Sequence, residues 1–146
     1  MTYIVGFTGT RKGMTAAQLA TLKALLLNVF VVSSRSRGSV ELHHGDCLGA
    51  DESAYLAAKA LGYRTVAHPP TSSALRAFTR SDVVLPKKPY LTRNLAIVKA
   101  SHRLVACPDG DEVQRSGTWQ TVRAARREGV AITVIYPCGT RKDEMP

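Results

Sequence analysis

Short apolar segments alternate with helical segments along this chain, and the alternation constrains the fold more than any other feature of the sequence. Apolar runs typical of buried strands cover residues 3–7, 40–44, 63–67, 103–107 and 130–136. Segments with helical periodicity or helical end signals separate them, as in the leucine-rich residues 19–30. A repeated strand–helix order predicts a parallel sheet with helices on both faces. We therefore expect an α/β fold, a Rossmann-like parallel sheet of about five strands.

One domain is expected to span residues 1–146. The chain has 146 residues, 45% of them hydrophobic, which is enough to bury a substantial core. Residues 68–89 are predicted to be irregular, residues 33–39 to form a loop, and residues 136–146 to form a polar tail. No apolar run reaches the ~18 residues of a membrane span, and the first residues lack the features of a secretory signal. These features predict no membrane partner.

Three widely spaced cysteines, Cys47, Cys107 and Cys138, predict free thiols in a reducing compartment. We therefore expect a cytoplasmic protein. His43, His44, Asp46 and Cys47 resemble a set of metal ligands in composition. However, neighbouring residues of a strand point to opposite faces, so the two histidines are not expected to share an ion. The sequence predicts no metal site and no cofactor.

The segment from Ser116 to Ala125 is predicted to open a helix directly after a polar loop. Backbone N–H groups in the first turn of a helix lack intrahelical partners, and the helix dipole adds positive potential there. Gly117 would let an anion approach the backbone, and Thr118 would cap the helix. This is a typical setting for a phosphate. The alternative is a well-capped helix with no ligand.

Two further glycine-rich loops follow predicted strands, at Thr8–Gly13 and Gly45–Asp51. A third loop, His68–Pro70, follows the next strand. Neither the dinucleotide-binding pattern nor the Walker A pattern is present. Because ligands of parallel α/β sheets bind beyond the carboxyl ends of the strands, we expect these loops and the Asp109–Thr118 loop to form one site.

The net charge of +9, from 20 Lys and Arg against 11 Asp and Glu, predicts affinity for polyanions or phosphorylated small molecules. The charge is spread along the chain rather than gathered in one tail or helix. A solvated surface therefore explains part of it.

Four short motifs in order resemble those of the SLOG superfamily, which includes DprA/Smf and the Lonely-guy phosphoribohydrolases. They are Gly6–Arg11, Gly45–Asp51, Arg93–Ile97 and Ser116–Thr121. The DprA-like side fits better, and the resemblance covers nearly the whole chain. It implies a Rossmann-like fold that binds a nucleotide, a nucleotide-derived molecule or single-stranded DNA, and it implies a homo-oligomer.

The candidate ligand-binding residues come from these motifs and from the loop after the third strand. Asp51 would bind a ribose hydroxyl or a loop amide, and Arg11 and Arg93 would pair with phosphates. The full set is Thr8, Gly9, Thr10, Arg11, Gly45, Asp46, Gly49, Ala50, Asp51, His68, Pro69, Arg93, Asn94, Ser116, Gly117, Thr118 and Thr121.

One departure from the Lonely-guy pattern decides between binding and catalysis. Thr121 stands where those hydrolases carry the glutamate tied to glycosidic cleavage, so the carboxylate that would stabilise an oxocarbenium-like centre is missing there. We therefore expect a protein that binds a phosphorylated nucleotide or nucleotide-derived molecule. A nucleotide N-glycosidase, with Asp46 or Asp51 as catalytic candidates, is the alternative. Single-stranded DNA binding is the second alternative.

Overall fold

The sheet of this protein is built outward from its first strand. A computed structural model describes all residues, Met1–Pro146. Its seven strands are ordered β4-β3-β2-β1-β5-β6-β7. They are β1 (Thr2–Gly9), β2 (Ser39–His44), β3 (Arg64–Ala67), β4 (Val83–Val84), β5 (Arg103–Cys107), β6 (Ala131–Ile135) and β7 (Arg141–Glu144). All neighbouring strands pair in parallel except β6 and β7, which are antiparallel.

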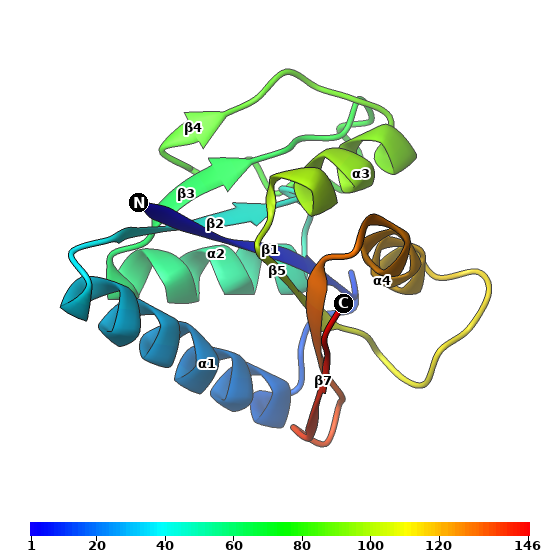
Figure 1. Ribbon diagram of the computed structural model, residues 1–146. Helices are drawn as coiled ribbons and strands as arrows, with labels where there is room; N and C mark the ends of the chain where they lie inside the picture. The colour runs from blue at the N-terminus through cyan, green and yellow to red at the C-terminus, as the bar shows by residue number, and fades with distance from the viewer.

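Helices cover both faces of this sheet (Figure 1). Helices α1 (Ala16–Arg35) and α2 (Ala50–Leu61) lie on one face, and α3 (Tyr90–Ala100) and α4 (Gly117–Glu128) lie on the other. Each layer has its own core. Phe7, Leu22 and Leu42 are fully buried on the α1–α2 side, and Leu104 and Val122 are fully buried on the α3–α4 side. The predicted α/β layering is confirmed.

The sheet has two more strands than the sequence predicts. β4 lies within the stretch expected to be irregular, and it holds only Val83 and Val84, too few for an apolar pattern. Asp82 anchors it, because its carboxylate accepts hydrogen bonds from the backbone N–H and the hydroxyl of Thr65. A long-range contact, rather than local propensity, therefore makes this strand.

The expected polar tail contains the last strand, β7, which runs antiparallel to β6. Its four residues, Arg141–Glu144, are all charged, so no apolar alternation identifies them. Backbone pairing with β6 holds the strand, and two ion pairs add to it, Arg126 to Glu144 at 2.9 Å and Arg103 to Asp143 at 3.5 Å. These residues are polar, as predicted, but they form a strand of the sheet.

Helix α1 begins at a local capping signal and extends into the predicted loop at residues 33–39. Thr15 and Gln18 form a reciprocal capping box, with both hydrogen bonds at 3.0 Å. The helix continues to Arg35, so the predicted loop at residues 33–39 is shorter than expected. By length and composition α1 could cross a membrane, which is weak evidence because core helices of other proteins pass the same test.

Candidate functional site

A cleft opens where the strand order reverses, between the carboxyl ends of β1 and β5. From β1 the chain builds the sheet through β2 and β3 to β4 at one edge. It then returns to β5, beside β1, and continues through β6 to β7 at the other edge. Ligands of open α/β sheets bind at such a point. The cleft has a volume of about 560 Å³, within the usual range for small-molecule sites. Thr8–Lys12 form one wall, and Ser116–Thr118 lie opposite.

The first turn of α4 supplies free backbone donors to this cleft. Ser116, not Thr118, caps the helix: its hydroxyl accepts from the Trp119 N–H at 3.2 Å, and its carbonyl accepts from the Gln120 N–H. The N–H groups of Gly117 and Thr118 therefore remain without an acceptor in the helix. Both residues line the cleft. This turn is suited to hold an anion.

The first and second glycine-rich loops are in backbone contact. The Ala50 N–H donates to the Thr10 carbonyl at 3.0 Å. Gly49 has φ of +89°, and a Cβ there would collide with the Arg11 carbonyl oxygen. Gly9 is equally constrained, because its Cβ would lie 2.5 Å from that of Ala50. The glycines therefore allow the loop after β1 to lie directly on the start of α2.

Asp51 places a carboxylate without an ion-pair partner at the cleft. The residue is 7% exposed, and its one hydrogen bond comes from the Cys47 N–H, at 3.2 Å. Burial raises the pKa of Asp51 to about 6, although the charge of Arg93 opposes the rise. A buried carboxylate that faces a cavity with spare acceptor capacity is suited to bind a hydroxyl or amino group of a ligand.

Arg93 ties together the loops after β2 and β3. This 5% exposed residue donates through Nη1 to the carbonyls of Gly45 and His68, and through Nε to the Asn94 side chain at 2.7 Å. Its Nη2 makes only a 3.9 Å contact with the Cys47 sulfur. Arg93 is therefore chiefly a structural tie, with one nitrogen left to face a ligand.

Positive groups gather at the mouth of the cleft. The Arg11 guanidinium lies 4.7 Å from the centre of the Tyr90 ring and forms no ion pair. Arg115 is exposed and also unpaired, whereas Lys12 contacts Asp109 at 3.0 Å. Arg11 and Arg115 are therefore free to meet a phosphate.

Most of the predicted ligand residues converge on this cleft. Those that line it are Thr8, Gly9, Thr10, Arg11, Gly45, Asp51, Arg93, Asn94, Ser116, Gly117 and Thr118. Six predicted residues do not line it, namely Asp46, Gly49, Ala50, His68, Pro69 and Thr121. Thr121 donates its hydroxyl to the Gly117 carbonyl within α4, which leaves it no part in the cleft.

Asp46 is turned away from the cleft and clamps the loop at residues 76–79. Its fully buried carboxylate accepts from Arg76 Nε at 2.7 Å and from the N–H and hydroxyl of Thr79 at 2.9 and 2.8 Å. The backbone of Asp46 is left-handed, with φ of 55°. All of its visible partners are structural, so the geometry assigns it to folding rather than catalysis.

The histidines form buried hydrogen-bond contacts outside the cleft. His43 bonds to His68 at 2.8 Å and to Glu41 at 2.9 Å, whereas His44, on the other face of β2, bonds to Ser81 at 2.9 Å. Burial lowers the pKa of His44 to about 4 and that of His68 to about 3. The rings of His44 and His68 are therefore neutral near pH 7.

Sequence reasoning missed several residues of the cleft. Tyr90 is the first residue of α3, a position outside all four motifs. Gln120 lies within the Ser116–Thr121 motif but was not among the candidate ligand-binding residues. Lys12 and Arg115 lie in two of the loops expected to form the site, although neither is among the named candidates. The missed lining residues are Phe7, Lys12, Cys47, Tyr90, Leu91, Ile97, Asp109, Val113, Arg115 and Gln120.

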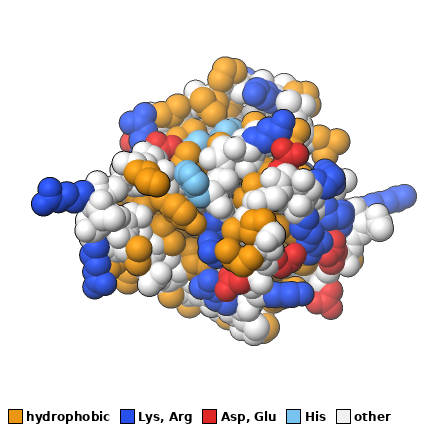
Figure 2. Space-filling view, in the orientation of Figure 1, with side chains coloured by type: hydrophobic (Ala, Val, Ile, Leu, Met, Phe, Trp, Pro, Cys, Tyr) orange, Lys and Arg blue, Asp and Glu red, His pale blue; other side chains and the backbone are white.

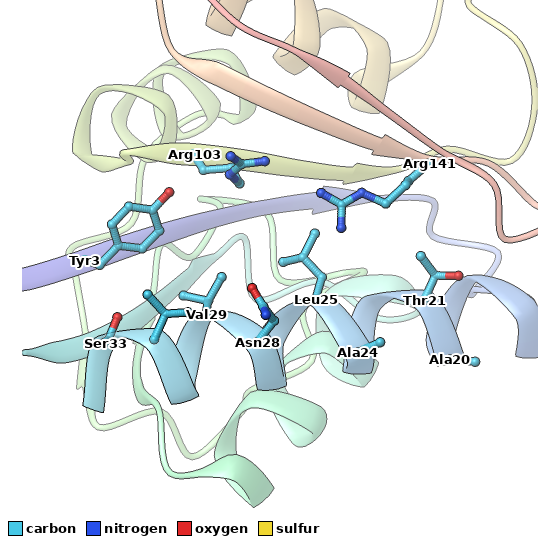
Figure 3. Close-up of a pocket in the computed structure, with 11 residues that line it drawn as sticks. Tyr3, Ala20, Thr21, Ala24, Leu25, Asn28, Val29, Ser33, Arg103 and Arg141 are labelled. Atoms are coloured by element: carbon cyan, nitrogen blue, oxygen red, sulfur yellow. The ribbon is translucent and has the colours of Figure 1, made fainter. Parts of the chain in front are cut away.

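A second, larger cavity of about 800 Å³ lies between α1 and the sheet (Figure 3). Arg103 and Arg141 project from the strands toward the apolar upper surface of α1, near Leu25 and Asn28. Asp143 contacts both arginines, at 3.5 and 3.0 Å. None of the loops that end the parallel strands contributes to this cavity, so it is separate from the cleft.

Fold and cleft together define a Rossmann-like protein with an open cleft at the carboxyl edge of the sheet. No family model matches the sequence, and neither does any curated protein. Solved structures do match. The molybdenum cofactor binding protein of Rippkaea orientalis has a TM-score of 0.70 at 20% identity, over 93% of this chain and 77% of that one.

Two structures of DNA processing protein A also share the fold. The protein from Streptococcus pneumoniae gives a TM-score of 0.69 at 18% identity, over 90% of this chain and 50% of that one. The protein from Helicobacter pylori, described for its single-stranded DNA binding mode, gives 0.60 at 19% identity, over 90% and 64%. The resemblance to the SLOG superfamily is therefore confirmed at the level of the fold.

Proposed function

We propose that this protein binds a phosphorylated nucleotide or nucleotide-derived small molecule in the cleft between β1 and β5, without turning it over. The observation that carries the proposal is the pair of free amides at Gly117 and Thr118, which line the same cleft as the unpaired Arg11. Amides at a helix start and a guanidinium are complementary to a phosphate. Asp51 would accept a hydrogen bond from the ligand's hydroxyl or amino group.

Calorimetric titration with the common nucleoside monophosphates, and with a Gly117→Ala variant, tests this proposal. The added methyl group meets no protein atom within 4 Å, so the fold is expected to be unchanged. It stands beside the free amides, however, and we expect affinity to fall about tenfold or more. Gly110→Ala is the control, because its methyl group also meets nothing within 4 Å and Gly110 does not line the cleft. Equal affinity of the Gly117→Ala variant and the unmodified protein would refute the proposal.

The hydrolase alternative depends on Asp51. Asp46 is engaged by Arg76 and Thr79, and Asp109, the other carboxylate of the cleft, contacts Lys12. Release of free base from a nucleoside monophosphate, lost in an Asp51→Asn variant, would favour this alternative. Binding without release favours the sensor, carrier or sequestering role.

The single-stranded DNA alternative is supported by the charge of +9 and by the fold shared with DNA processing protein A. The two functions differ in salt dependence. Binding of a long single strand releases many counterions and weakens steeply with rising salt, whereas a single phosphate gives a shallow dependence. We expect the shallow dependence.

We further propose that the protein is a cytoplasmic homo-oligomer. Its three cysteines are free thiols, as a reducing compartment would require. Helix α1 carries only two charged residues, Lys23 and Arg35, and exposes Leu27, Val31 and Val32 by 49, 37 and 55%. Several exposed apolar side chains on one helix are typical of an interface.

A further inference from the structure

A side groove extends the cleft along the surface between α3 and α4. Its volume is about 460 Å³, and three residues, Leu91, Asn94 and Gln120, line both the side groove and the cleft. The two hollows therefore meet at these residues. The remaining lining residues of the side groove are Leu95, Gln114, Thr121, Arg123, Ala124 and Arg127.

The chemistry of the side groove differs from that of the cleft. No carboxylate lines it, whereas Asp51 and Asp109 line the cleft. Three carboxamide side chains, Asn94, Gln114 and Gln120, offer both donors and acceptors, as recognition of a heterocyclic base or a sugar requires.

Leu91, Leu95 and Ala124 add apolar surface on which a planar ring could lie. Leu91 is 67% exposed, at the junction of the side groove and the cleft. Arg127 is exposed and forms no ion pair, so it adds one available positive charge.

Hydrogen bonds and ion pairs hold the loop that walls the side groove against α4. Arg123 donates to the Gln114 carbonyl at 3.0 Å and to the Val113 carbonyl at 3.3 Å. It also pairs with Glu112 at 3.0 Å, as does Arg126 at 3.1 Å. In Figure 2, Lys and Arg side chains with Asp and Glu between them gather over α4 and the loop before it. A preformed wall reduces the entropy lost on binding.

We propose that the ligand has two parts: a phosphate held in the cleft, and a second base or sugar, linked through that phosphate, that lies in the side groove. The ligand class is then a dinucleotide rather than a mononucleotide. This inference rests on the proposed function, because the cleft has to hold the phosphate.

Matched titrations with each nucleoside monophosphate and the corresponding dinucleotide test the inference. The unmodified protein is expected to bind a dinucleotide about tenfold more tightly than its monophosphate. Ala124→Leu fills the side groove and is expected to abolish this preference while leaving monophosphate affinity unchanged. Because Ala124 is 7% exposed and touches the core, Arg127→Ala provides a second variant without that risk. Lys99→Ala, which removes an exposed cation of α3 outside both hollows, is the control.

Each outcome separates the two proposals. Equal affinity for monophosphate and dinucleotide, or equal loss of both in the Ala124→Leu variant, overturns the side-groove inference and leaves the cleft proposal intact. Binding of neither ligand overturns both. A further steep gain with a longer oligonucleotide identifies a nucleic acid, rather than a small dinucleotide, as the ligand and also overturns the inference.

Discussion

The two buried aspartates of the second loop differ in what surrounds their carboxylates. Asp46 is paired with Arg76 and Thr79, whereas Asp51 has a single backbone hydrogen bond and no cation within ion-pair distance. A paired buried carboxylate supports the fold, and an unpaired one opposes it when ionised. The same residue type therefore serves structure at one position and is available to a ligand at the other.

Asparagine at these two positions is expected to have opposite effects. Asp46→Asn leaves the partly exposed Arg76 without its anionic partner and should lower the free energy of unfolding by about 3 kcal/mol, with ligand affinity unchanged. Asp51→Asn removes a carboxylate whose pKa burial raises to about 6. This carboxylate is ionised at pH 7, and its buried charge lowers the free energy of unfolding there. The Asp51→Asn substitution should raise the free energy of unfolding by up to about 3 kcal/mol and weaken ligand binding.

Urea unfolding at pH 7 and calorimetric titration provide the two readouts. Loss of affinity in the Asp46→Asn variant, under conditions where it is fully folded, would return Asp46 to the list of ligand-binding candidates. Unchanged affinity in the Asp51→Asn variant would remove Asp51 from it.

Acid sensitivity is expected from the buried histidines. The folded protein keeps His44 and His68 neutral down to pH about 4 and 3, but the unfolded chain protonates them near pH 6.5. Protons therefore favour unfolding, and stability should fall as the pH drops from about 6.5 toward 4. The raised pKa of Asp51 has the opposite effect on stability over part of this range. The protonated Asp51 carboxyl favours the fold, and this contribution is lost as the pH rises through about 6.

The measurement is the free energy of unfolding in urea at several pH values between these limits. His44→Gln, which retains polar hydrogen-bonding groups without the titration, should flatten the curve. If the free energy of unfolding of the His44→Gln variant changed with pH as steeply as that of the unmodified protein, His44 would not be a source of the acid sensitivity.

At the scale of the elements, the start of α2 depends on a glycine that touches another loop. Gly49 and Gly13 have similar left-handed φ values, +89° and +96°. A Cβ at Gly49 would strike the Arg11 backbone, whereas a Cβ at Gly13 would meet nothing within 4 Å. Both positions carry the strain of a positive φ, and Gly49 alone adds a collision with the neighbouring loop.

Alanine at Gly13 is expected to cost about 1 kcal/mol, the strain of a side chain at positive φ. Alanine at Gly49 should cost at least 2 kcal/mol more, on the order of the largest single-residue effects, because the first loop has to move. Thermal unfolding of both variants measures the difference. Equal losses would mean that the contact between the loops contributes nothing to stability.

Elements with local signals were predictable from the sequence, and elements made by distant contacts were not. The Thr15–Gln18 capping box, the glycine stop at Gly62 and the apolar strand before Cys107 each carry their signal within a few residues. β4 and β7 have no such local signal. The hydrogen bond from Thr65 to Asp82 positions β4, and the ion pair between Arg126 and Glu144 stabilises the end of β7. At the cleft, most candidates from the motifs line it, but Tyr90 and Leu91 come from the start of α3, outside the motifs, and only the fold brings them near.

For the molecule as a whole, α1 presents an exposed apolar surface. Two hollows border this helix and enlarge that surface. The cavity of Figure 3 lies on one side of this helix, and a groove against α2, which includes Leu56, lies on the other. Contact between two copies through this face would remove Leu27 and Val31 from water.

Leu27→Lys should therefore convert an oligomer to a monomer in gel filtration with light scattering, with little change in the fold, because Leu27 is 49% exposed. Leu91→Lys, at a more exposed leucine of α3, is the control and should leave the mass unchanged. A single-chain mass for the unmodified protein would refute self-association.

Both borders of the sheet are closed to backbone pairing with another molecule. β7 presents only charged side chains, and β4 is two residues long, with Pro86 and Lys87 soon after it. Short or charged border strands prevent one sheet from continuing into the next. Growth by joining the sheet of one molecule to that of the next is thus disfavoured, which leaves the helix-covered faces as the surfaces for contact between copies.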